Sequence, residues 1–128
     1  MKKSIVMILA VSAVAVSMAA CSQNRQEILS DRVREFSLNY KWGKFQLAGE
    51  CVIEEKRVEF LKKLKGVEKD LTIEDYTVTK VDYKPGDGKA RVLFEMKYLM
   101  MPDTKSKSRS GEQEWVWDRE TWYLKSGY

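Results

Sequence analysis

The residue with the clearest chemical prospect in this chain is Cys21, because of what precedes it. Lys2 and Lys3 form a basic start, residues 4–20 carry no charge, and residues 18–20 read Met-Ala-Ala directly before the cysteine. A positive flank, an apolar centre and small residues at the end form the layout of a secretory signal peptide. The pattern predicts that this segment is cleaved and that a thiol then stands at the new N-terminus.

The same residues resemble the lipobox of bacterial lipoproteins, although Met18 stands where that motif usually has leucine. In that family the cysteine thiol receives diacylglycerol, the peptide bond before the cysteine is cut, and the new amino group is often acylated. The resemblance implies a lipid-anchored protein of the cell envelope, with a signal peptide at residues 1–20, palmitate-type acyl chains on Cys21, and a lipidated tether at residues 21–26. In many Gram-negative species an aspartate after the cysteine retains the protein in the inner membrane, so Ser22 favours the outer membrane, facing the periplasm.

An uncleaved membrane helix is the alternative interpretation of this N-terminal segment. The uncharged run, residues 4–20, is barely as long as the roughly 17–25 residues that a membrane-spanning helix needs. Ser12, Ser17 and several alanines also dilute its apolar character. The small residues and the thiol at its end therefore favour cleavage and lipidation.

The absence of histidine limits the chemistry that the rest of the chain can perform. Ser-His-Asp and Cys-His catalysis, and nearly every zinc or haem site, depend on histidine. We therefore expect no metal and no cofactor. The second cysteine, Cys51, is a lone thiol that could pair with another chain or react, but such a residue is more commonly a small buried hydrophobe. We predict that Cys51 is buried.

The balance of charge argues against a nucleic-acid partner. Once Lys2 and Lys3 are removed, 21 basic residues face 19 acidic ones, which leaves a net charge of +2. A charge this small creates no field that would attract nucleic acid. Removal of residues 1–20 leaves 108 residues, which suits a single domain spanning residues 27–128.

Helical patterns occupy the first half of this domain. Asn24 and Glu27 have the spacing of a capping box, which would start a helix. The helix that follows has an apolar stripe at spacings of four, three and four positions: Leu29, Val33, Phe36 and Tyr40. A short helical turn is expected around Phe45 and Leu47. A further helix is predicted over residues 54–65, with lysines in its last turn and Gly66 as a left-handed cap. Its apolar face comprises Val58, Leu61 and Leu64, with Phe60 beside them.

From Leu71 onward the apolar residues alternate with a period of two, which indicates strands. A first strand is expected from residue 71 to 83, with a bulge near Thr79-Lys80. Residues 85–88 form a turn, and the clearest strand follows at 90–100, where the even-numbered residues are apolar. The third strand is predicted at 105–117, a turn at 118–120 and a short last strand at 121–125. One apolar and one mixed face are typical of an antiparallel sheet covered on one side, and helices followed by three to four strands indicate an α+β fold.

This arrangement resembles the nuclear transport factor two-like (NTF2-like) superfamily, whose members form a cone-shaped cystatin-like roll. The most suggestive piece is residues 113–124, Gln-Glu-Trp-Val-Trp-Asp-Arg-Glu-Thr-Trp-Tyr-Leu, which looks like the closing hairpin of small secreted members. The resemblance covers about residues 27–125. It implies N-terminal helices packed on a curved antiparallel sheet.

Three groups of residues could carry chemistry, and each has a structural alternative. An aromatic set could line a ligand pocket in the cone or simply fill the core: Phe94, Tyr98, Trp115, Trp117 and Trp122. A second set could supply an aspartate base and tyrosine donors, as in the related ketosteroid isomerases and polyketide cyclases: Asp75, Asp82, Asp118, Tyr76, Tyr83 and Tyr98. A third set places cations on one face of a strand, where they could meet anionic groups or protect a sheet edge: Lys105, Lys107 and Arg109.

The sequence favours a binding module over an enzyme. We expect a lipid-anchored, non-catalytic envelope protein that binds a partner protein or a small apolar ligand, without nucleic acid, metal or cofactor. The alternative is a histidine-free isomerase or cyclase that uses Asp and Tyr in the cone. A binding domain should have a filled core beneath the helices, whereas an enzyme should have a water-accessible cavity with a buried carboxylate.

Overall fold

The computed structural model describes residues 24–84 and 86–128. The predicted signal peptide and Cys21 lie outside the described residues. An N-terminal helix covers residues 24–41, and six further elements follow in the order α2 (Phe45–Gly49), α3 (Glu54–Lys65), β1 (Leu71–Tyr83), β2 (Lys89–Met100), β3 (Lys107–Asp118) and β4 (Thr121–Ser126). The predicted α+β class is confirmed.

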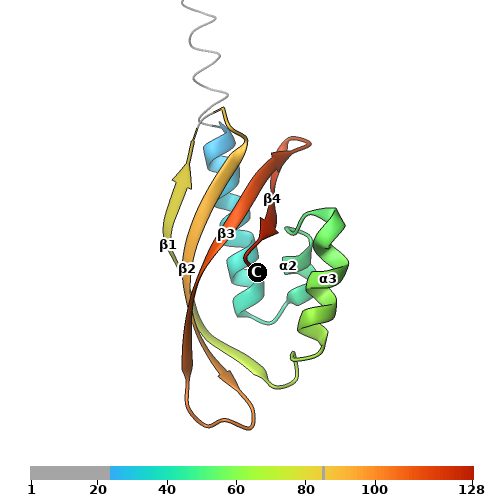
Figure 1. Cartoon of the computed structure of the whole chain (residues 1–128), viewed down its shortest axis with the longest axis vertical. Coiled ribbons are helices and arrows are strands. Elements are labelled where there is room, and N and C mark those ends of the chain that lie inside the picture. The colour runs from blue at the N-terminus through green and yellow to red at the C-terminus, as the bar shows by residue number, and fades with distance from the viewer. Residues whose placement is uncertain (1–23, 85) are drawn as a thin grey trace, which may run out of the picture.

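The four strands form one antiparallel sheet in sequence order, β1-β2-β3-β4. β1 contains two register shifts against β2, one between Ile73 and Asp75 and one between Val78 and Lys80. The second shift is the predicted bulge near residues 79–80. Bulges bend a strand and increase its twist, and Figure 1 shows the long strands curving along their length.

The face of the sheet that is covered by the helices is set by the alternation in β2. Its buried side chains are the predicted even-numbered ones: Ala90, Val92, Phe94 and Met96. They belong to a single core cluster together with the apolar stripe of the N-terminal helix: Leu29, Val33, Phe36 and Tyr40. The predicted stripe is confirmed, and the core lies between this helix and the sheet.

The start of the N-terminal helix corrects the sequence analysis. Residues 24–26 are already helical, so the described helix includes the last three residues of the predicted tether, and Asn24 lies within the helix and not at the N-cap of a capping box. Tertiary contacts hold this first turn. The Trp122 Nε1 atom donates a hydrogen bond to the Arg25 carbonyl at 2.8 Å, and the Arg25 guanidinium lies 4.7 Å from the centre of the Trp117 ring.

Helix α3 has the predicted bounds but not the predicted face. Phe60 and Leu64 are buried, whereas Val58 is 77% exposed. Gly66 has φ −70 and is therefore not a left-handed cap. The chain instead continues into a further turn, in which the Val67 and Glu68 amides donate to the Leu64 carbonyl at 3.0 and 2.8 Å. The expected C-terminal charges are present, since Lys62, Lys63 and Lys65 all lie in the last turn.

The segment between α2 and α3 is tied to the last strand. The Leu124 amide donates to the Cys51 carbonyl at 2.8 Å, and the Ile53 amide donates to the Leu124 carbonyl at 2.9 Å. Arg57 adds a bond from its Nε to the Gly49 carbonyl at 2.9 Å. Cys51 is fully buried, as predicted, and forms no disulfide within the described part of the chain.

Candidate functional site

The space between the N-terminal helix and the inner face of the sheet, which we call the cone, is where the sequence analysis considered a ligand site. Strand register brings together the residues that line it. β2 and β3 pair Val92 with Gln113, Phe94 with Gly111, and Met96 with Arg109 on the inner face. The helical residues Phe36 and Tyr40 and the β1 residue Tyr76 meet them from the other sides.

A short chain of hydrogen bonds crosses this interior. The Trp115 Nε1 atom donates to the Gln113 Oε1 at 3.0 Å, and the Gln113 Nε2 atom donates to the Tyr76 hydroxyl at 2.6 Å. Gln113 is 1% exposed, so an amide without partners there would be costly. Every buried side-chain nitrogen or oxygen of the described residues has a partner, and the chain of bonds therefore supports the fold.

The tyrosines of the interior are held in their protonated form. Burial, followed by the nearby Tyr40, raises the pKa of Tyr76 well above its usual 10.0, although the hydrogen bond from Gln113 and the charge of Arg109 oppose this. Burial likewise raises the pKa of Tyr40, with Arg109 acting in the opposite direction. A tyrosine with a raised pKa can donate a hydrogen bond but is a poor base near neutral pH.

Among the described residues, the cavity that the structure shows inside the cone is very small. The cavity between Tyr40, Tyr76 and Arg109 has a volume of about 10 Å³, which is about the minimum for one water molecule. Its remaining lining is apolar or aromatic: Phe36, Phe94, Met96 and Tyr128. The lining that the structure describes contains no aspartate or glutamate, and small-molecule sites usually need roughly 300–1,000 Å³. Around these residues, within the part of the chain that the structure describes, the interior is a filled core.

The structure separates the carboxylates that the sequence put forward from these tyrosines. Asp75, Asp82 and Asp118 are all exposed. Asp75 lies near the cone but pairs with Lys41 at 3.9 Å and accepts a bond from the Thr77 hydroxyl at 3.3 Å. The alternative interpretation, in which an aspartate and a tyrosine meet in a dry cone, is therefore not the arrangement of these three residues.

The aromatic candidates are mainly core residues. Phe94, Trp115 and Trp122 are at most 4% exposed, and Tyr98 and Trp117 pack against the same cluster. Tyr83 is also structural, since its ring lies 5.8 Å from that of Trp122. The structural alternative, core filling, is confirmed for this set.

The three cations divide between two environments. Lys105, which the sequence analysis placed in the third strand, lies in the connection before β3, because that strand begins only at Lys107. Lys107 pairs with Asp103 at 2.8 Å, and this partner raises its pKa. Arg109 is placed at the rim of the cone beside Tyr40 and Tyr76. The sequence analysis missed this union of Arg109 with Tyr40, because only the pairing of β2 with β3 and the packing of the helix bring them together.

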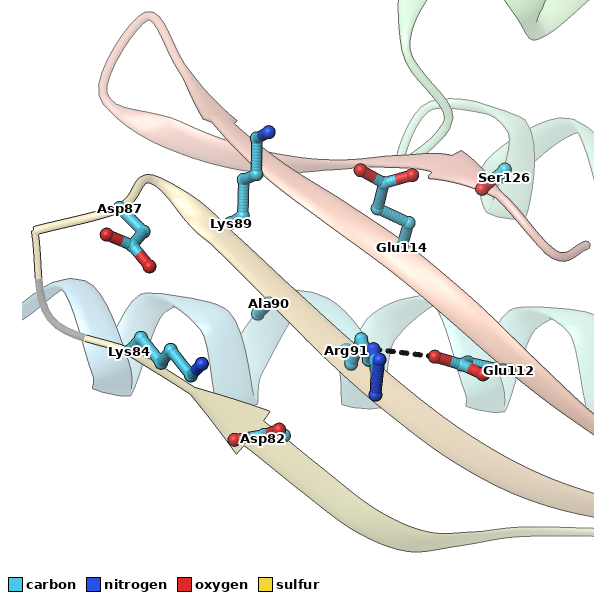
Figure 2. Close-up of a pocket in the computed structure, with 9 residues that line it drawn as sticks. All are labelled: Asp82, Lys84, Asp87, Lys89, Ala90, Arg91, Glu112, Glu114 and Ser126. Carbon is cyan, nitrogen blue, oxygen red and sulfur yellow. Dashed lines mark ion pairs between the residues drawn. The ribbon is translucent and has the colours of Figure 1, made fainter.

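A polar hollow lies on the outer face of the sheet. Figure 2 shows the side chains that line it, most of them from β1, β2 and β3. The hollow is open to solvent and has a volume of about 460 Å³. Cations and carboxylates alternate there: Asp82, Lys84, Asp87, Lys89, Arg91, Glu112 and Glu114. Arg91 pairs with Glu112 at 2.7 Å, but both side chains are more than half exposed. Exposed pairs contribute only about 0–1 kcal/mol, and the mixed charges indicate no particular ligand.

Two further observations concern the described residues. Among them, no group of cysteine, aspartate or glutamate side chains is arranged to hold a metal ion. No helix in residues 24–84 and 86–128 is both long enough and apolar enough to cross a membrane. The predicted anchor and its alternative, an uncleaved helix, both fall outside these residues.

Comparison with known proteins identifies the fold. No protein-family model and no curated protein matches this sequence. An NTF2-like protein with a cystatin-like fold from Novosphingobium aromaticivorans matches with a TM-score of 0.55 at 9% identity, over 85% of this chain and 82% of its own. The fold is NTF2-like.

Two other solved structures belong to proteins that have been proposed to be enzymes. A polyketide cyclase candidate from Xanthomonas campestris has a TM-score of 0.59 at 12% identity, over 80% of this chain and 90% of its own. A scytalone dehydratase candidate from Novosphingobium aromaticivorans has the same TM-score at 11% identity, over 80% of each chain. At such identities the likeness shows the NTF2-like fold and no activity, because one fold supports many functions.

Proposed function

We propose that this protein is a lipid-anchored binding module of the bacterial cell envelope, whose NTF2-like domain engages a partner protein without catalysis. The observation that carries the proposal is the filled cone. Its cavity of about 10 Å³ leaves no room for a substrate or for a small apolar ligand, whose sites need roughly 300–1,000 Å³. Binding must then use the outer surface of the domain, and a partner protein is the class of ligand that suits such a surface.

The anchor is argued from Cys21 and the segment before it. Each buried methylene of an acyl chain contributes about 0.8 kcal/mol, and a single chain alone binds a bilayer only marginally. Two or three chains on Cys21 would hold the domain at the membrane without help from the folded part. Ser22 favours the outer membrane, with the domain in the periplasm.

The alternative function, a histidine-free isomerase or cyclase, has one point in its favour. Tyr76 presents a protonated hydroxyl inside an NTF2-like cone, as such an enzyme would require. However, Asp75, Asp82 and Asp118 are exposed, so none of them is the buried base that this chemistry needs.

Metabolic labelling with a palmitate analogue tests the anchor. The wild-type chain should incorporate the label and migrate at the size of the 108 residues that remain after cleavage. Cys21→Ala should do neither, because no other residue there can form the thioether. Fractionation alone is ambiguous, since the uncleaved precursor keeps its apolar segment. Equal labelling of both chains would refute the anchor.

Substitution inside and around the cone tests the absence of catalysis. Asp75→Asn, Asp82→Asn, Asp118→Asn and Tyr76→Phe should each leave the phenotype of a deletion strain complemented, because none of these groups reacts with a substrate. Tyr76→Phe keeps the aromatic ring but removes the acceptor of the buried Gln113 Nε2, so it should cost about 1–3 kcal/mol of stability, and its phenotype is read together with its abundance. Complete loss of function in a variant that is stable and correctly located would favour the enzyme instead.

A further inference from the structure

The groove between α2 and α3 leaves apolar side chains without a partner. It has a volume of about 650 Å³ and is lined by Phe45, Leu47, Val58 and Leu61 among others. Val58 is 77% and Leu47 45% exposed. Single exposed hydrophobic residues are ordinary, but residues that gather in one hollow mark an interaction site.

A second hollow extends this groove past the end of the N-terminal helix. It has a volume of about 290 Å³, and the two hollows share Gly43 and Phe45. Trp42, which is 70% exposed, lines this second hollow. The two hollows therefore adjoin each other, and we call them together the α2–α3 groove. Tryptophan is enriched among the residues that dominate protein interfaces.

One face of helix α3 lines this groove. Val58, Leu61, Lys62 and Lys65 all line it, at the i, i+3, i+4 and i+7 spacing of a single helix face. Phe60 and Leu64, on another face of the helix, are buried in the core. Helix α3 therefore presents a second, partly apolar face to solvent.

Lysines surround the apolar residues of the groove. Lys44, Lys62 and Lys65 line it, and Glu68 is the carboxylate among its lining residues. Within the described chain these three lysines form no ion pair. Lys41 in the adjoining hollow has only a long contact of 3.9 Å to Asp75. The rim is therefore positive, and a ligand with negative flanks would be complementary.

We propose that the α2–α3 groove binds an amphipathic helical segment of a partner protein, with apolar residues along one side and acidic residues on its flanks. This inference rests on the proposed function, a lipid-anchored module that binds a partner protein, and names the surface and the chemistry of that partner. An apolar groove with a charged rim is a recurrent way of binding an amphipathic helix. Trp42, Leu47 and Val58 would enter the interface core, and the lysines would lie at its edge.

The position of the groove favours a protein over the bilayer that holds the anchor. Cys21 lies only three residues before the described N-terminal helix, whose residues 24–41 span about 27 Å at 1.5 Å per residue. Figure 1 shows α2 and α3 beside the half of this helix that is remote from residue 24. A lipid on Cys21 would therefore hold the opposite end of the domain at the membrane.

A second copy of this chain is a poor occupant on electrostatic grounds. A two-fold symmetric contact presents the same patch from both subunits. Lys44, Lys62 and Lys65 of one copy would then face the same lysines of the other, and like charges repel across an interface. The acidic partner is the occupant that this surface fits.

A peptide-binding experiment on the full, processed chain in nanodiscs of zwitterionic lipid tests this proposal. The probe is a fluorescent helical peptide with leucines at i, i+3, i+4 and i+7 and glutamates on the flanks, followed by fluorescence anisotropy. A second peptide keeps the leucines and replaces the glutamates by lysines. Saturable binding of the acidic peptide, at least tenfold tighter than that of the basic one, is expected.

Three variants locate the binding. Val58→Asp and the charge reversal Lys62→Glu should each weaken binding of the acidic peptide, the first by at least tenfold and the second by severalfold, and both sites are exposed enough for the fold to survive. Leu93→Asp is the matched control, because Leu93 is exposed on the outer face of the sheet. It should change the affinity by less than twofold. An equal loss with Leu93→Asp, or absence of saturable binding, would overturn the proposal.

The remaining outcomes identify a different occupant. If the protein binds anionic vesicles and Val58→Asp abolishes this binding, the groove binds a membrane. If the protein sediments as a dimer and Val58→Asp dissociates the dimer, the groove binds a second copy. Either result overturns the proposal. Failure of the palmitate labelling would remove the anchor but leave the peptide result, which can be repeated on the chain in solution. Failure of peptide binding with intact labelling would remove only this inference.

Discussion

The contact between Phe94 and Gly111 allows the packing of the cone to be tested by a double-mutant cycle. Phe94 is 4% exposed and stacks on Tyr76, with ring centres 5.1 Å apart and ring planes inclined by 6°. A Cβ placed on Gly111 would lie 2.6 and 2.7 Å from two carbons of the Phe94 ring. The ring and any side chain at position 111 therefore compete for the same space.

The expected magnitudes follow from this competition. Phe94→Ala should lower the free energy of unfolding by about 3–5 kcal/mol, since it removes a buried aromatic ring. Gly111→Ala should lower it by about 1–3 kcal/mol, because an overpacked core must shift. In the Phe94→Ala background the new methyl group enters vacated space. The double variant should therefore be about 1–3 kcal/mol more stable than the sum of the two single losses predicts, because the loss due to Gly111→Ala is relieved.

Urea titrations followed by circular dichroism measure these differences. The slope of the free energy against urea should stay constant, so that the midpoint reports stability. Leu93→Ala is the control on the outer face, where the side chain is 37% exposed, and its loss should be clearly smaller, about 1 kcal/mol. Losses that are equal at positions 93 and 94 would refute the assignment of faces. Strict additivity of Phe94→Ala and Gly111→Ala would refute the competition for space.

Three further predictions concern other parts of the domain. Burial raises the pKa of Cys51 from 9.0 to about 11, so the thiol of the unfolded chain ionises at a lower pH than the thiol of the folded protein. The stability that the protonated Cys51 contributes should therefore be complete below pH 9 and be lost as the pH rises to about 11. In urea titrations at a series of pH values, Cys51→Val should reduce the fall in stability between pH 9 and 11. The folded thiol should react slowly with iodoacetamide, and rapid alkylation would contradict its burial. Trp122→Phe removes the 2.8 Å hydrogen bond to the Arg25 carbonyl, and this loss should lower the free energy of unfolding by about 1 kcal/mol. Amide hydrogen exchange near Arg25 should become faster. Unchanged exchange would show that the bond does not stabilise this turn of the helix. Glu120 has φ 70, which disfavours side chains, so Glu120→Gly should raise the thermal midpoint, by about 1 kcal/mol in free energy; a lower midpoint would mean that the side chain offsets the strain.

The sequence alone was sufficient to predict the helices and strands whose apolar residues repeat with a clear period. The alternation in residues 90–100 predicted both a strand and its buried face, because successive side chains of a strand point to opposite sides. The stripe from Leu29 to Tyr40 predicted a helix for the corresponding reason. The bulge near Thr79-Lys80 was visible as a break in the period.

Predictions from the sequence failed where a local pattern was compatible with two structures. Val58 continues the apolar face of α3, yet it is 77% exposed, because Phe60 and Leu64 already meet the core. Gly66 follows a row of lysines as a left-handed cap would, but the chain goes on to bond to the Leu64 carbonyl. The spacing of residues along the chain predicts which side chains share a face of a helix. It does not predict which face packs against the rest of the protein.

What the sequence by itself determined is therefore the order of the elements, the inner face of β2 and the burial of Cys51, all of which depend on near neighbours along the chain. The tertiary structure alone decided that Tyr40, Tyr76, Gln113 and Arg109 meet, that the cone is filled, and that an apolar groove with a basic rim lies between α2 and α3. These residues are far apart in the sequence. Their union depends on strand register and on how helices settle on a curved sheet, and both are set by the simultaneous packing of the whole core.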